Sequence, residues 1–85
     1  MMKYTVVWKP AAEAELAELW MTAIDRVALA QAANEIDDRL AKEPQSLGES
    51  RSGSTRVWFV APLGVTYEIL DDDRLVRVVD VWPTS

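Results

Sequence analysis

Two arginines in a short polar stretch are the residues of this chain best suited to bind an anionic group. Arg51 and Arg56 lie close together in the sequence, and no acidic residue separates them. An arginine side chain is always protonated, and it grips phosphate or carboxylate oxygens through a planar fork of N–H donors. The stretch fits either a local basic patch or a solvated loop with ordinary surface charges, and the net charge of the whole chain is −5. A nucleic-acid-binding protein usually has the opposite balance, because neutralising phosphates drives its affinity.

The side chains that most often move protons or bind metals are absent. The sequence has no histidine and no cysteine, which removes the commonest general base, thiol chemistry and disulfides. With no secretory signal and no membrane-spanning run, we expect a cytoplasmic protein that does not associate with membranes. Asp71, Asp72 and Asp73 are typical of a tight turn, so we predict no metal and no cofactor.

The first half of the chain predicts one strand followed by two helices. Lys3–Trp8 is rich in β-branched and aromatic residues, which favours a strand, and Pro10 suits the first turn of a helix. Asp25 is a good N-cap for a second helix, which ends at Pro44. The apolar residues expected to face the core recur at helical spacing: Ala12, Leu16, Leu19, Trp20 and Ala23, then Leu29, Ala32, Ala33, Ile36 and Leu40.

The second half predicts a polar connector and three short strands. Gln45–Ser54 has almost no apolar residue and is interpreted as a loop, either functional or a plain surface crossover. Val57–Val60, Leu63–Leu70 and Leu75–Val81 read as strands joined by short turns, which favours antiparallel pairing. With only 85 residues, we expect a single domain spanning residues 1–85.

These elements predict an α+β fold of order β-α-α-β-β-β, with an antiparallel sheet and a helical hairpin packed on one face. Trp8 and Trp20 are expected in the core, and so is Tyr67 with its hydroxyl paired. Trp58 is expected on the outer face, where an exposed aromatic would mark an interaction site. Trp82 is predicted either to stack on an RNA base or, more in keeping with its position, to pack against the helices.

Three phrases in this order resemble the RelE/ParE superfamily of toxins from type II toxin–antitoxin systems. They are KYTVVWKPAAEAELAELW near the start, RLAKEPQSLGES at the end of the second helix and LGVTYEILDDDRLVRVVDVW over the last strands. The resemblance spans the length of the chain and implies a RelE/ParE-like domain. It further implies a cognate antitoxin as partner and a role of the kind associated with plasmid stabilisation.

In the ribonuclease branch of that superfamily, toxins cut messenger RNA, usually within the ribosome. The resemblance would place an arginine where this chain has Gly64 and a histidine or basic residue where it has Trp82. A later tyrosine or basic tail is also missing up to Ser85. Arg51, Arg56 and Arg77 remain as candidate catalytic residues, and Arg51, Arg56 and Trp82 as candidate nucleic-acid contacts. The usual ribonuclease site is therefore predicted to be incomplete. Losing one charge-stabilising donor typically costs ~10²–10³ in rate, so a site that lacks several such residues should retain little catalysis.

Three functional hypotheses follow from these observations. The first is a toxin-like component that binds an antitoxin and acts without cutting RNA, as in the gyrase-poisoning branch. The second is an endoribonuclease, free or ribosome-dependent, with an atypical arginine-based site. The third is a degenerate relative that serves as a non-toxic binding or homo-oligomerisation module.

Overall fold

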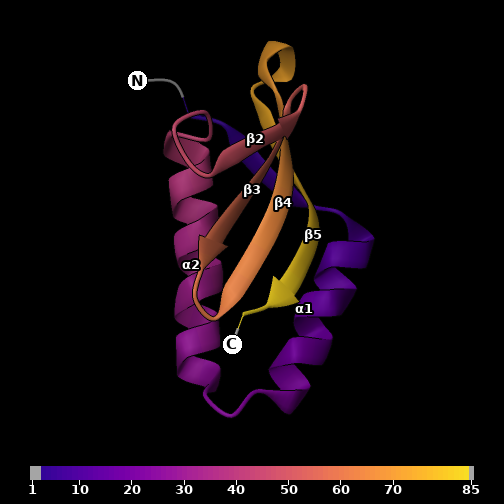
Figure 1. Ribbon diagram of the computed structural model, residues 1–85, viewed down its shortest axis with the longest axis vertical. Coiled ribbons are helices and arrows are strands. Elements are labelled where there is room, and N and C mark those ends of the chain that lie inside the picture. The colour runs from indigo at the N-terminus through magenta and orange to yellow at the C-terminus, as the bar shows by residue number, and fades with distance from the viewer. Residues whose placement is uncertain (1–2, 85) are drawn as a thin grey trace.

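An amphipathic pair of helices and a five-stranded sheet share one core in the computed structural model, which describes residues 3–84 (Figure 1). The elements follow in the order β1 (Thr5–Trp8), α1 (Pro10–Thr22), α2 (Arg26–Lys42), β2 (Glu49–Ser52), β3 (Thr55–Val60), β4 (Leu63–Leu70), the short 3₁₀ helix η1 (Asp71–Asp73) and β5 (Leu75–Pro83). The α+β class and the central pair of helices predicted from the sequence are confirmed.

Local sequence signals set where both helices begin. Pro10 occupies the first position of α1, where its missing N–H costs no hydrogen bond. The carboxylate of Asp25 accepts a hydrogen bond from the backbone N–H of Ala28 at 3.0 Å, and this confirms the predicted cap of α2. Trp20 departs from the prediction, because its side chain is 43% exposed on the outer side of α1.

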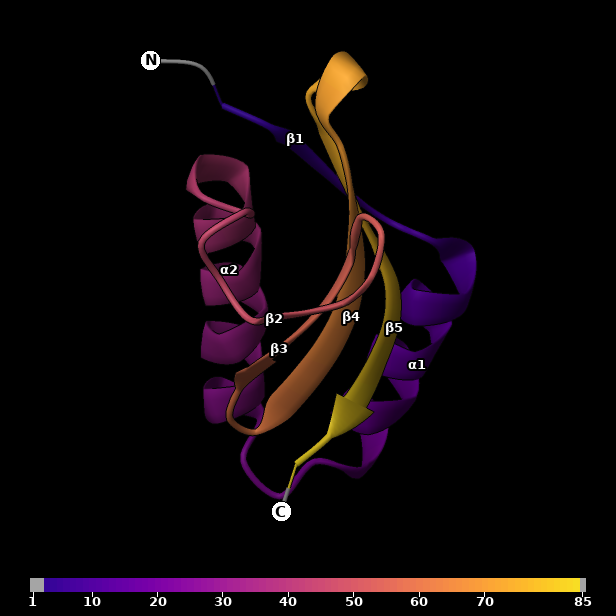
Figure 2. The ribbon, with the colours of Figure 1, turned by 45° about the horizontal axis from the view of Figure 1, so that its top comes forward.

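The sheet has the strand order β1-β5-β4-β3-β2. The predicted antiparallel meander of β3, β4 and β5 is confirmed by the register of the pairs. The expectation of a wholly antiparallel sheet is wrong at one edge, where β1 pairs in parallel with β5. β1 leads directly into α1, and α1 packs along β5 (Figures 1 and 2).

The polar connector contains a strand that the sequence did not predict. Glu49–Ser52 forms β2 and pairs with β3 at the other edge of the sheet. All four residues are exposed, so the strand is held by backbone hydrogen bonds without an apolar pattern. Gly53, with a φ of 56°, opens the two-residue turn between Ser52 and Thr55, and this Gly-Ser pair was the available hairpin signal.

Only one face of the sheet is buried. The buried side chains of β4 alternate along the strand, and those of β5 and α2 complete the same cluster. α1 adds to this cluster from beside β5, with Ala12 fully buried and Leu16 packed against it. The opposite face, called the outer face below, is covered by no helix among residues 3–84. The core side chains of the sheet are Leu63, Val65, Tyr67, Ile69, Val76, Val78 and Val81.

Tyr67 links the core to the segment between α2 and β2. Its buried hydroxyl donates to the carbonyl oxygens of Pro44 and Leu47, at 2.8 and 2.9 Å. This confirms the prediction of a core tyrosine with a paired hydroxyl. Burial raises the pKa of the Tyr67 phenol above its ordinary value of 10.0, and the nearby positive charge of Arg56 opposes that rise.

Replacing Tyr67 with phenylalanine tests this anchor. We expect Tyr67→Phe to lower the free energy of unfolding by about 1–2 kcal/mol near pH 7, because the Pro44 carbonyl loses the shared hydroxyl proton and the Leu47 carbonyl keeps only Arg56 as donor. The raised pKa of Tyr67 means that its contribution is fully present below pH ~10 and is lost as the pH rises through the folded-state pKa. The stability gap between wild type and variant should therefore shrink above pH ~10 in urea unfolding experiments.

Tyr4 provides the internal control for that experiment. Its pKa is also raised, chiefly by the hydrogen bond that its hydroxyl donates to Asp71, and it is present in both proteins. Its effect on the alkaline side therefore cancels in the difference. A gap that stays constant from pH 7 to pH 11 would contradict the burial-driven shift at Tyr67.

Candidate functional site

Arg56 lies on the core side of the sheet, where it holds backbone rather than presenting a free charge. Its Nε donates to the carbonyl oxygen of Leu47 at 2.8 Å, and its Nη2 donates to that of Gly48 at 3.2 Å. The same Leu47 carbonyl accepts from Tyr67. Arg56 therefore helps to fix the path of the chain between α2 and β2, and two of its guanidinium nitrogens already donate to backbone carbonyls.

Arg77 lies on the outer face in the middle of β5, and it is paired with an acid. Its Nη1 is 3.4 Å from Oε1 of Glu68 on the neighbouring strand β4. Both side chains are about one-third exposed, so solvent weakens the pair. Arg77 does not stand free to receive a phosphate.

Arg51 is exposed on the edge strand β2, three strands away from Arg77 in the sheet order. The structure thus places the three candidate arginines at the sheet edge, on the core side and at the centre of the outer face. Arg51 follows Ser50, the β2 partner of Arg56, so these two arginines are neighbours in the β2–β3 hairpin, whereas Arg77 lies apart from both on β5. The outer face carries Glu68 beside Arg77, and the strand register places Asp80 and Glu49 farther along and across the same face.

An aromatic pair occupies the end of the outer face, where Phe59, Gly64 and Trp82 form a row across β3, β4 and β5. The rings of Phe59 and Trp82 meet edge to face, with centroids 6.0 Å apart. The indole lies directly over Gly64, since a Cβ placed there would be 2.6 Å from the ring. Any larger side chain at position 64 and the Trp82 ring compete for the same space.

Trp58 and Trp82 lie on the faces opposite to those predicted. Trp58 packs against the core and has the guanidinium of Arg39 over its ring at 5.9 Å, whereas Phe59 is the exposed aromatic of β3, at 56%. Trp82 does not pack against the helices as expected. A bulge leaves Val79 unpaired between Val78 and Asp80, which reverses the phase of β5 and turns Trp82 outward.

A second candidate surface lies where α1 and α2 join, and no pattern in the sequence indicated it. Four large apolar side chains gather there, and we call them the helix-end patch. They are Trp20 (43% exposed), Met21 (74%), Ile24 (105%) and Val27 (67%). A shallow groove of about 470 Å³ continues along α1 from Trp20 and Met21 towards Glu13.

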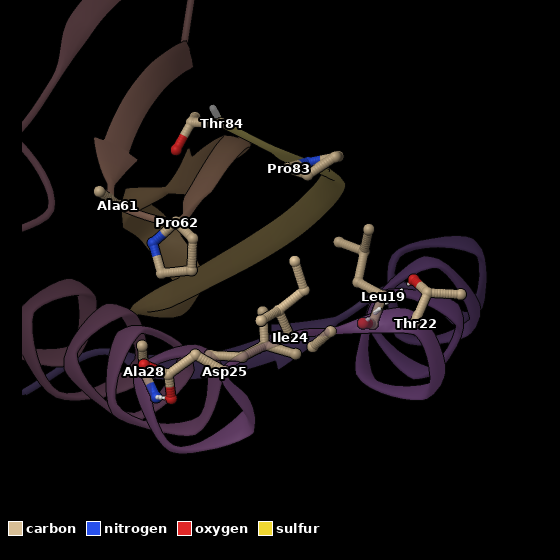
Figure 3. A pocket seen from close by; sticks show the side chains of 11 residues that line it. Leu19, Thr22, Ile24, Asp25, Ala28, Ala61, Pro62, Pro83 and Thr84 are labelled. Carbon is tan, nitrogen blue, oxygen red and sulfur yellow. Dashed lines mark hydrogen bonds between the residues drawn. The ribbon is translucent and has the colours of Figure 1, made fainter.

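An apolar pocket of about 600 Å³ adjoins the helix-end patch. Figure 3 shows Leu19 and Ile24 on the helical side of its opening, with Pro62 and Pro83 on the opposite side. The helical wall comes from the α1–α2 connection, and the other wall comes from the β3–β4 turn and the end of β5. Exposed apolar surface of this kind usually marks a site for another protein or a ligand.

Within residues 3–84, no three acidic side chains are placed to hold a metal ion. Asp71 instead accepts hydrogen bonds from Gln45 and Tyr4 at the turn formed by η1. Neither helix has the length and apolar composition needed to cross a membrane.

Comparison with known proteins gives a consistent result. Residues 6–85 match a sequence profile of the family described as the ParE toxin of type II toxin–antitoxin system, parDE. A search of curated protein sequences finds no match. The RelE/ParE resemblance inferred from the sequence is confirmed by the profile match.

Solved structures share the fold at low sequence identity. The toxin–antitoxin complex RelBE2 from Mycobacterium tuberculosis is similar with a TM-score of 0.80 and 21% identity, over 98% of this chain and 93% of that chain. The chromosomal ParDE system from P. aeruginosa gives a TM-score of 0.71 at 14% identity, over 96% and 97%. The intact E. coli RelBE complex gives 0.70 at 13% identity, over 96% of both chains.

A double-mutant cycle tests the competition between position 64 and Trp82. An alanine in a strand is ordinarily favoured over glycine, so Gly64→Ala should stabilise β4 if space allowed it. Because the new Cβ meets the indole, we expect a loss of about 1–3 kcal/mol in unfolding free energy instead. In the Trp82→Ala background the same change should cost at least ~1 kcal/mol less, measured by urea denaturation. Additive effects of the two substitutions would show that the indole does not restrict position 64.

Proposed function

This chain belongs to the family of ParE toxins of type II toxin–antitoxin systems, and from that premise we propose that it acts as a toxin by binding proteins rather than by cutting RNA. The observation that carries the proposal is the outer face of the sheet. There the only candidate arginine, Arg77, is paired with Glu68, and two further carboxylates lie on the same face.

RNA cleavage by attack of the 2′-hydroxyl needs charge stabilisation at the phosphate, together with a base and an acid. Positive charge on the outer face is outnumbered by Glu49, Glu68 and Asp80, which repel a phosphate backbone. The chain contains no histidine to serve as base or acid. Trp82 fills the space over Gly64 that a longer side chain at that position would need. These features favour a non-nucleolytic toxin, of which the gyrase-poisoning type is the nearest example in the superfamily.

A cognate antitoxin is the partner that this function requires, and the helix-end patch supports its docking there. The patch exposes four large apolar side chains beside a pocket. Burying these side chains against a partner would be favourable, and contiguous exposed apolar surface marks an interaction site. An antitoxin segment that folds on binding can bury such side chains. Antitoxin binding on the helical side of the domain would leave the outer face free for a target.

Inducible expression in a bacterial host tests the proposal, with growth and total RNA followed in the same cultures. We expect growth arrest while messenger and ribosomal RNA stay intact. Arg51→Ala and Arg77→Ala should arrest growth as wild type does, because neither side chain performs RNA chemistry. Co-expression of the small protein encoded beside the toxin should relieve arrest for wild type but not for Ile24→Glu, which places a charge in the exposed patch.

Gln31→Glu is the matched control for Ile24→Glu. Gln31 is exposed on α2, so the variant gains the same charge away from the patch and should still be relieved. RNA cleavage that disappears in Arg51→Ala or Arg77→Ala would establish the endoribonuclease instead. Unchanged growth together with self-association of the chain would favour a non-toxic oligomerisation module.

A further inference from the structure

Trp82 differs from the other tryptophans of residues 3–84, because neither a cation over its ring nor an acceptor for its N–H is present. Trp20 and Trp58 each have an arginine guanidinium over the ring, at 5.8 and 5.9 Å, and Trp8 donates its indole N–H to Asp37 at 2.7 Å. Among residues 3–84, the Trp82 ring has no cation over it and its N–H has no acceptor. Its neighbour is Phe59, which meets it edge to face and is itself 56% exposed.

An unpaired carboxylate lies beside this aromatic pair. Asp80 is two positions from Trp82 on β5, and the register places both on the outer face, roughly 7 Å apart along the strand. Asp80 is exposed, and its Oδ1 accepts only the N–H of the next residue, Val81, at 3.0 Å. Within the part of the chain that the structure describes, no lysine or arginine pairs with it.

We infer that Phe59, Asp80 and Trp82 form a receptor for an arginine side chain of a partner protein, and we call them the arginine receptor. The inference rests on the proposed function, since it assigns the kind of protein segment that the outer face binds. A guanidinium stacks on an aromatic ring and at the same time forms two hydrogen bonds to a carboxylate. The free indole N–H of Trp82 can donate to a backbone carbonyl of the same segment.

Charge complementarity selects this occupant over nucleic acid. Single-stranded RNA also stacks on aromatic rings, but its phosphates would lie against Asp80, Glu49 and Glu68. A lysine would satisfy the carboxylate without stacking as a plane, so it should bind more weakly. The domain already places a guanidinium over two of its other tryptophans, Trp20 and Trp58.

Nuclear magnetic resonance of the isotopically labelled, full chain tests the arginine receptor directly. The probe is a blocked peptide, Gly-Arg-Gly-Arg-Gly, compared with the same peptide carrying citrulline or lysine in place of arginine. We expect saturable shifts at the Trp82 indole N–H and the Asp80 amide with the arginine peptide, weaker shifts with lysine and none with citrulline. Asp80→Asn should weaken binding by about five- to tenfold, the loss typical of one charge-assisted hydrogen-bonded pair.

Asp72→Asn is the matched control, because it removes an exposed carboxylate from η1 and should leave the peptide affinity unchanged. Phe59→Ser removes an exposed ring and should also weaken binding without unfolding the domain. Equal binding of the citrulline peptide, or equal loss with Asp72→Asn, would overturn the inference. Tighter binding of a single-stranded RNA oligonucleotide at the same resonances would also overturn it, as would occupation of the site by Arg51 of a second copy.

The outcome can be separated from that of the proposed function. Growth arrest with intact RNA but no peptide binding would leave the toxin role standing and remove the arginine receptor. Peptide binding by a chain that does not arrest growth would keep the receptor and remove the toxin role.

Discussion

The structure depends on the packing of one apolar sheet face against two helices, which leaves the other face open. A chain of 85 residues has enough apolar side chains for one core layer, and the buried set is drawn from alternate positions of β4 and β5 and from one side of α2. Tyr67 and Arg56 then tie the α2–β2 segment to the edge of this core through the Leu47 carbonyl. Because no third layer exists among the described elements, the outer face is available for function.

The bulge in β5 decides what that open face presents. Without it, strict alternation from Val76 and Val78 would carry Asp80 and Trp82 into the core, where the carboxylate would be buried without a partner. The extra residue at Val79 brings Val81 inward and sends Asp80 and Trp82 outward together. Gly64 completes the arrangement, because the absence of a side chain leaves room for the indole over the backbone of β4.

The sequence was informative wherever the side-chain pattern determines the structure. The helical spacing of Leu29, Ile36 and Leu40, the cap at Asp25 and the strand Leu63–Leu70 were all predicted and found. β2 was missed because an exposed edge strand is stabilised through its backbone, which leaves no apolar pattern. The parallel pairing of β1 was missed because strand direction at a sheet edge depends on the whole chain path.

The candidate site was less predictable for a related reason. A strand side chain changes face with a one-residue shift in phase. The types of residue in the sequence predict neither the bulge at Val79 nor the register of β3. The adjacent pair Val78–Val79 was the only local sign of a phase change in β5. For the same reason the sequence could nominate Arg51, Arg56 and Arg77 but could not show that Arg77 lies on the outer face, apart from Arg51 and Arg56 in the β2–β3 hairpin.

Absence of RNA cleavage is the central claim, and a purified translation system measures it most directly. The chain is added to ribosomes translating a defined messenger RNA, and every new 5′ end is mapped by primer extension. We expect a pattern identical to that without the chain, because the outer face has more carboxylates than cations and the sequence has no histidine. New ends that appear with the wild-type chain and vanish with Arg77→Ala would contradict it.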